Sequence, residues 1–293
     1  MSAEIVAQNI VFGLFVGSNY GIAAVGLSLV FGVLRVLNVA HGELLMLGGY
    51  VTFWLFTQLG LDPFASVLVC APAMFVFGLA LDRGLFVFVQ RLDDDSKIKN
   101  SLLISFGLTL VLQNAAQALW SADERSVSSS LIGGGTVILG VAIPYTRLGA
   151  MLVSLLVVLA LHQLLQRTYF GKAVRATAED WEAAAVAGIN VQRTYLLTFG
   201  IGAALAGVAG TLVSVQYSIA PSIGLVWTLK ALVVVVLAGL GSIFGAFLAG
   251  LALGVAEQLS VFVIGASYRE VVGLVLFLLV LVLRPQGLFG RAR

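Results

Sequence analysis

The sequence predicts an all-α polytopic membrane protein that forms one transmembrane domain over residues 1–293. Hydrophobic residues make up 60% of the chain and charged residues only 10%, whereas a soluble domain carries about 25% charged residues. The apolar residues also gather in eight long runs, and a transmembrane helix needs about 20 such residues. Composition and run length therefore exclude a soluble class, and we expect between 8 and 10 crossings of the membrane.

The eight runs follow one another at 9–34, 44–60, 64–81, 101–120, 148–166, 195–216, 228–256 and 271–283. The seventh run is too long for one simple crossing, and Gly239, Gly241 and Gly245 interrupt it. Because glycine weakens a helix interior, we expect a broken helix or a helical hairpin at this point.

Lys and Arg collect in cytoplasmic segments and so predict the orientation. If residues 91–99, 167–194 and 284–293 share one side, that side holds 12 of the 16 Lys and Arg residues, counting Arg35 and Arg83. The other side keeps Arg125, Arg147, Lys230 and Arg269. We therefore expect a cytoplasmic C-terminus and an N-terminus outside.

The predicted outer loop, residues 121–147, is the longest polar segment on the outer side. It ends in TVILGVAIPY, an alternating stretch that predicts a small β-hairpin around Gly140. Its position also suits contact with an extracytoplasmic partner.

The predicted cytoplasmic segment 167–194 contains a short helix. Thr177 and Asp180 have the spacing of a capping box, and Gly188 stands where a glycine commonly ends a helix. These signals predict a helix near 178–187, about 15 Å long. Trp181 lies on one stripe with small residues, so the helix could fit a groove of a partner; an amphipathic helix on the lipid surface is the alternative.

Several stretches resemble known permeases. The run from Glu182 through Ala183 and Ala184 to Gly188 is similar to the E-A-A-x-x-x-G motif of permease subunits of ABC importers. Four further stretches resemble motifs of the high-affinity branched-chain amino acid permeases: LNVAHGE with MLGGY at 37–50, GKAVRATA at 171–178, LAGLGS with GA at 237–246, and LRPQGLFG at 283–290.

The resemblance implies a permease subunit of the inner membrane, in which the run from Glu182 to Gly188 forms the coupling helix that docks on a cytoplasmic ATPase. The ATPase-coupling residues would be Thr177, Asp180, Trp181, Glu182, Ala183, Ala184 and Gly188. It implies as partners a second related permease, two ATPase subunits, an extracytoplasmic substrate-binding protein and membrane lipid. ATP and magnesium would bind to the ATPases, and this chain would bind no cofactor or metal. The substrates would be branched-chain or other small amino acids, with urea or short amides as the alternative.

Polar residues next to glycines mark the candidate translocation path, because polar groups inside a membrane are costly. The first group is Asn38, His41, Gly42 and Glu43, and the second is Gly239, Gly241, Ser242 and Gly245. The two groups suggest a two-fold pseudo-repeat of glycine-broken helices. For the first group, the alternative is a turn near the inner surface, with Glu43 paired to Arg35 and His41 held by a structural hydrogen bond.

No phosphate-binding loop, metal-ligand spacing or nucleophile triad stands in the sequence, which argues against an enzyme. The net charge of +2 is too small to imply a nucleic-acid partner. An ion-coupled secondary transporter or channel is the alternative from another class. It needs carboxylates inside the membrane, and Glu43 and Glu257 are the candidates, although we expect Glu257 and Arg269 to lie near interfaces.

Overall fold

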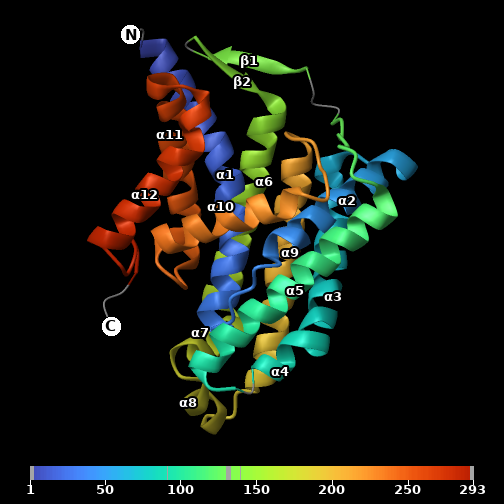
Figure 1. Cartoon of the computed structure of the whole chain (residues 1–293), viewed down its shortest axis with the longest axis vertical. Helices are drawn as coiled ribbons and strands as arrows, with labels where there is room; N and C mark the ends of the chain where they lie inside the picture. Colours follow the sequence, from blue (N-terminus) through green and yellow to red (C-terminus); the bar gives the residue numbers. More distant parts are fainter. Residues whose placement is uncertain (1–2, 91, 130–132, 139, 291–293) are drawn as a thin grey trace.

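The computed structural model describes residues 3–90, 92–129, 133–138 and 140–290 and is almost entirely helical (Figure 1). The α-helices are α1 Ala3–Leu34, α2 His41–Leu59, α3 Pro63–Leu81, α4 Val87–Val89, α5 Asp94–Trp120, α6 Tyr145–Arg167, α7 Tyr169–Glu179, α8 Trp181–Val186, α9 Val191–Ser214, α10 Ile223–Ala238, α11 Ile243–Ile264 and α12 Arg269–Leu283. A π-helical turn η1 (Asp82–Phe86), a 3-10 turn η2 (Ala266–Tyr268) and strands β1 (Gly135–Ile138) and β2 (Val141–Pro144) complete the chain.

Seven helices in the described part of the chain are long and apolar enough to cross a membrane. The helices α2 and α10 add two apolar segments of 19 and 16 residues. At 1.5 Å per residue, α10 is about 24 Å long, shorter than the bilayer core of about 30 Å. The polytopic all-α prediction is confirmed, with long helices and at least one short one.

Two opposite ends of the molecule define its long axis. The N-terminus and the strands β1 and β2 lie at one end, here called the hairpin end, and α7 and α8 lie at the other, the α8 end (Figure 1). The 32-residue α1 runs between the two ends. Near its start, the Gln8 side chain donates to the Ala142 carbonyl of β2 at 3.0 Å. Which end faces the cytoplasm stays a prediction from the positions of Lys and Arg.

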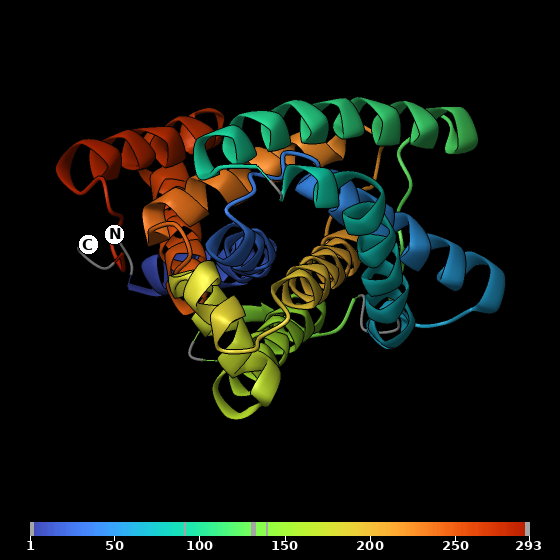
Figure 2. The same ribbon diagram turned by 90° about the horizontal axis from the view of Figure 1, so that it is seen from below.

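Close contacts between glycines hold α1 against α11. A Cβ on Gly17 would lie 2.6 Å from the Gly250 carbonyl oxygen, and one on Gly13 would lie 2.5 Å from the Val255 Cα. Such small residues let two backbones approach closely, which is how helices associate where no water drives them together. Seen from below, α1 and α9 lie in the interior, and α5 and α12 line one side of the bundle with α10 behind them (Figure 2).

The expected break in the seventh apolar run is confirmed. α10 ends at Ala238, α11 begins at Ile243, and Gly239 and Gly241 between them have φ angles of 98° and 87°. Residues with a Cβ rarely adopt these angles. The end of the chain packs on this break, where the Leu288 N–H donates to the Leu237 carbonyl at 2.8 Å.

The β-hairpin expected around Gly140 is also confirmed. β1 and β2 pair antiparallel, with Ile138 opposite Val141. Gly140 has a φ of 80°, as a tight hairpin turn requires. Leu139 and residues 130–132 of the predicted outer loop lie outside the described residues.

Candidate coupling segment and helix junction

The coupling segment predicted at 167–194 folds as two short helices, α7 and α8. Asp180 separates them with extended backbone angles, and its Oδ1 accepts hydrogen bonds from the N–H groups of Glu182 (2.9 Å) and Ala183 (3.0 Å). Asp180 is therefore the N-cap of α8. At the other end, Gly188 has a φ of 86°, and the Ile189 N–H donates to the Ala184 carbonyl at 3.0 Å. This is the expected glycine stop of a helix.

The predicted capping box and the single helix over 178–187 are wrong. Thr177 lies inside α7 and is buried, and its hydroxyl has no hydrogen-bond partner among the described residues. α7 begins earlier because the Thr168 hydroxyl caps it by accepting from the Gly171 N–H at 3.0 Å. The chain then stays helical through alanine-rich sequence until Asp180 turns it. α8 is consequently only 6 residues long.

α8 touches the membrane-spanning helices through Trp181. The Lys97 ammonium group, in the first turns of α5, lies 5.3 Å from the centre of the Trp181 ring, within the range of a cation–π contact. Beside this contact is a cavity of about 160 Å³, also lined by Val33 and Arg35 from the end of α1 and by Tyr195 of α9. The coupling segment thus lies against three membrane-spanning helices at once.

The outer surface of α8 is exposed in the part of the chain that the structure describes. Glu182, Ala183 and Ala185 are exposed and Val186 is 91% exposed, while Ala184 is buried against the bundle. A large aliphatic side chain is thus exposed at the tip of the molecule. The choice between a protein partner and the lipid surface for α8 stays a prediction.

The first polar group begins in a non-helical segment, 35–40, which contains Asn38 and lies beside α5 before it reaches His41. Arg35 has a left-handed backbone (φ 53°), which reverses the chain after α1. The buried hydroxyls of Ser101 and Ser105 on α5 then accept from the N–H groups of Leu37 and Val39, each at 3.0 Å. These bonds satisfy backbone groups that would otherwise be unpaired inside the protein.

His41 consequently begins α2 deep in the bundle. It is 1% exposed, and its Nε2 lies 3.0 Å from the Ala23 carbonyl oxygen of α1. Ala23 precedes the end of α1 at Leu34 by 11 residues, or about 17 Å along the helix. The expected structural hydrogen bond of His41 is confirmed, but its expected place near the inner surface is wrong. Asn38 is buried too, and its side chain accepts from the Ala40 N–H at 3.1 Å.

The start of α2 meets the start of α10 at this depth, and we call the contact the helix junction. The Gly42 N–H donates to the Thr228 hydroxyl at 2.9 Å, and that hydroxyl donates to the Val39 carbonyl at 2.9 Å. A Cβ on Gly42 would overlap the Gly224 carbonyl oxygen. Gly42 is therefore required for two helix ends to touch.

Glu43 lies at the helix junction with no partner for its carboxylate. It is fully buried, both carboxylate oxygens lack a hydrogen bond among the described residues, and the side chain presses on Gly224. The expected pairing of Glu43 with Arg35 is therefore wrong. The positive ends of two helix dipoles, those of α2 and α10, stand on either side of this acidic group.

The second polar group does not join the first. Gly241 packs on Gly32 near the end of α1, and Gly245 lies against Phe289 of the chain end. Ser242, the N-cap residue of α11, is half-buried. Gly224 at the helix junction and Ala238 at the break are 14 residues, or about 21 Å, apart along α10. The two-fold pseudo-repeat stays a prediction.

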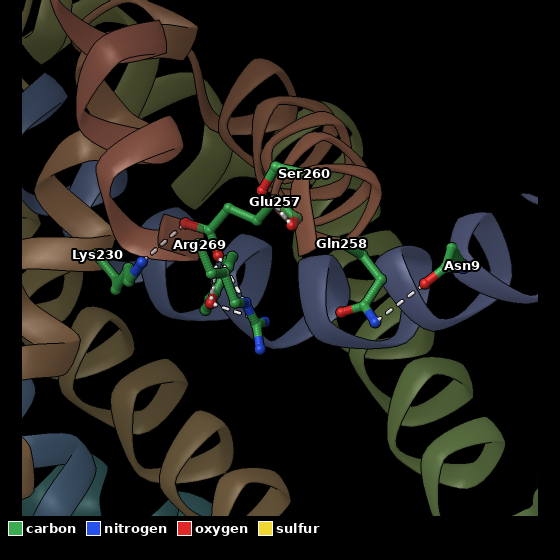
Figure 3. A network of polar contacts seen from close by, with 7 residues as sticks. Asn9, Lys230, Glu257, Gln258, Ser260 and Arg269 are labelled. Atoms are coloured by element: carbon green, nitrogen blue, oxygen red, sulfur yellow. Dashed lines mark hydrogen bonds and ion pairs between the residues drawn. The ribbon is translucent and has the colours of Figure 1, made fainter. Parts of the chain in front are cut away.

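A buried charge cluster around Glu257 was missed in the sequence. Glu257 is fully buried in α11, and its oxygens meet Lys230 Nζ at 2.8 Å and Arg269 Nε at 3.3 Å (Figure 3). The Tyr20 hydroxyl donates to the same carboxylate at 2.9 Å. The members come from four helices and lie as many as 249 positions apart, so no local pattern could have revealed them. Glu257 is enclosed by protein, and its expected place near a membrane interface stays a prediction.

The sequence was compared with known protein families and with individual proteins. Residues 9–283 match the model of the branched-chain amino acid transport system permease component. The chain is 37% identical to the high-affinity branched-chain amino acid transport system permease protein BraD of Pseudomonas aeruginosa, over 97% of this chain and 95% of that protein. It is 35% identical to the permease protein LivH of Escherichia coli over the same shares, and 29% identical to LivM of Salmonella typhimurium over 94% of this chain and 68% of that protein. No solved structure matches the chain significantly.

Proposed function

The chain belongs to the family of branched-chain amino acid transport permease components, and from this premise we propose how it works within an importer. It is a multi-pass permease subunit of an ATP-binding cassette importer for branched-chain amino acids, and its relatives' names specify permeases of branched-chain amino acid transport systems. The observation that carries the proposal is the capped, outward-facing α8 beneath a bundle of membrane-spanning helices.

The coupling role falls to α8. An ATPase subunit would bind the exposed face of α8, with Glu182 and Val186 in the interface. A movement of α8 would reach α5 through the Trp181–Lys97 contact, and it would reach the end of α1 beside Arg35. Since the non-helical segment that begins at Arg35 leads into His41 at the start of α2, the same movement would be passed to the helix junction.

The helix junction is the proposed gate of the translocation path. Short helices whose ends meet inside a membrane protein are where transporters place substrate and ion sites. Unpaired Glu43 is the group most able to attract the ammonium end of an amino acid when the junction opens. The residues at the second break, Gly239 to Gly245, hold the end of the chain and would act as a hinge.

The partners follow from the family. The relatives are permease components of transport systems, and similarity to LivH and LivM alike supports pairing with a second, related permease. Two ATPase subunits, which would bind ATP and magnesium, and an extracytoplasmic binding protein complete the proposed assembly. The α8 end would face the cytoplasm and the hairpin end the outside.

Two other functions are weaker. Import of urea or short amides would use the same machinery, but the relatives' names specify branched-chain amino acids. An ion-coupled transporter needs free carboxylates in the membrane, yet Glu257 is neutralised by two cations. Only Glu43 of the two predicted carboxylates is unpaired, and ion coupling leaves the exposed α8 without a role.

The test is affinity purification of the tagged chain from its native membranes. We expect an ATPase pair to co-purify and to be lost from the double variant Glu182→Arg, Gly188→Trp. The matched control is Glu124→Arg, Gly133→Trp, which changes an exposed acid and an open, positive-φ glycine at the hairpin end. A chain that purifies alone and transports without ATP would refute the proposal.

A further inference from the structure

The cluster around Glu257 contains two cations and one carboxylate, so its net charge is positive. Glu257 supplies one carboxylate, while Lys230 and Arg269 supply two cations. Glu270, the next residue of α12, is exposed and forms no ion pair with either cation in the described part of the chain. An excess charge inside membrane-spanning helices is costly unless an opposite charge meets it.

The two cations still have donors to offer. Lys230 gives one of its three N–H groups to Glu257, and Arg269 gives its Nε to Glu257 and an Nη2 to Tyr20 at 3.4 Å. Their side chains remain 16% and 29% exposed, whereas Glu257 is completely enclosed. Figure 3 shows Glu257 between them, so the carboxylate holds both cations in place while part of each faces outward.

An aliphatic surface adjoins Lys230 on the same helix. Val226 lies one turn before Lys230, and Leu229 lies directly beside it; they are 51% and 56% exposed. α10 contacts α12 and, more weakly, α5, and these two helices flank it on one side of the bundle (Figure 2). The surface therefore joins the exposed parts of the two cations to exposed aliphatic groups.

We infer that Lys230 and Arg269 bind the α-carboxylate of an aliphatic amino acid on this side of α10, with Glu257 and Tyr20 as positioning residues. The inference rests on the proposed function and adds a substrate contact to it. Lys230 lies in the middle of α10 and Arg269 is the first residue of α12. Their partly exposed donors lie beside exposed aliphatic side chains, so a ligand that has one carboxylate and an aliphatic side chain suits the site, and a lipid headgroup is the occupant that the choice of nanodisc lipid tests.

The test uses the assembled permease pair with its ATPases in nanodiscs of phosphatidylcholine, with radiolabelled leucine and no binding protein. We expect Lys230→Met to weaken leucine binding about tenfold or more, because a charge-assisted hydrogen bond is lost. 4-Methylpentanoate, which keeps the carboxylate, should compete with leucine, and leucinol, which lacks it, should not. Lys230→Arg should bind nearly as well as the native chain.

Arg147→Met is the matched control, because Arg147 is a half-buried cation that lies over Phe12 at the hairpin end, and leucine binding should not change in it. If Lys230→Met fails to assemble, Arg269→Gln, which keeps the Lys230–Glu257 pair, carries the same prediction. Unchanged leucine binding in an assembled variant would overturn the inference. So would equal competition by leucinol, or loss of binding when phosphatidylglycerol replaces phosphatidylcholine. A native assembly that imports no aliphatic amino acid with ATP and binding protein would instead overturn the proposed function.

Discussion

Gly42→Ala should separate the two helices of the helix junction. The new methyl group would overlap the Gly224 carbonyl oxygen and the Thr228 hydroxyl, so α2 and α10 must move apart. Overpacking of this kind costs about 1–3 kcal/mol, and loss of the bond from the Gly42 N–H to Thr228 adds about 1 kcal/mol. We expect a total loss of roughly 2–4 kcal/mol.

The assay is thermal unfolding of the purified assembly together with ATP-driven leucine uptake. A loss of this size should lower Tm by roughly 5–10 °C, and uptake should fall while the ATPases still co-purify, because α8 is unchanged. The control is Gly107→Ala on α5, where an added Cβ meets nothing within 4 Å and alanine should stabilise the helix by roughly 0.5–1 kcal/mol. A Gly42→Ala protein with native Tm and native uptake would show that the junction is not closely packed.

Three further changes test the coupling segment and the start of α5. Asp180→Ala removes the N-cap of α8 and should cost about 1 kcal/mol of local stability. We expect faster hydrogen exchange in residues 181–186 and weaker co-purification of the ATPases. If Thr177→Val speeds exchange equally, the assignment of Asp180 as the cap is contradicted. Gly188→Ala keeps the space but opposes a φ of 86°, so it should cost about 1–2 kcal/mol and show the same exchange signature, and native protection would count against it. The pKa of Asp93 is lowered by its hydrogen bonds to Ser96, so the ionised Asp93 cap stabilises α5 above the ordinary carboxyl range, and this stabilisation is lost as pH falls through the lowered pKa. Hydrogen exchange at the start of α5 should therefore become faster in acid, and Asp93→Asn should abolish this pH dependence. An unaltered pH profile in Asp93→Asn would refute the link.

Local patterns were enough to predict most of the fold. Apolar runs identified the long helices, and the glycines at 239 and 241 marked the break because glycine weakens a helix interior. In the structure both glycines adopt positive φ angles. The hairpin around Gly140 was predicted from an alternating stretch of residues, and the helix stop at Gly188 from the position of the glycine. Each of these features depends on residues within a few positions of one another.

The parts that could not be predicted depend on distant partners. His41 and Glu43 were expected near the inner surface because nothing nearby shows that Ser101, Ser105 and Thr228 hold the segment at depth. The division at Asp180 was missed because both sides of it favour helix. Two alanine-rich stretches give the same local signal whether they form one helix or two.

The hydrogen bonds that residues 35–42 form with hydroxyl groups far along the chain also limit the order in which the protein can fold during synthesis. The N–H group of Leu37 bonds to the hydroxyl of Ser101, which is synthesised 64 residues later, and the N–H group of Gly42 bonds to that of Thr228, 186 residues later. During synthesis, α1 and α2 therefore enter the bilayer before the groups that satisfy the chain between them exist. Biogenesis cannot be completed hairpin by hairpin, and this stretch reaches its final position only after α10 has been inserted.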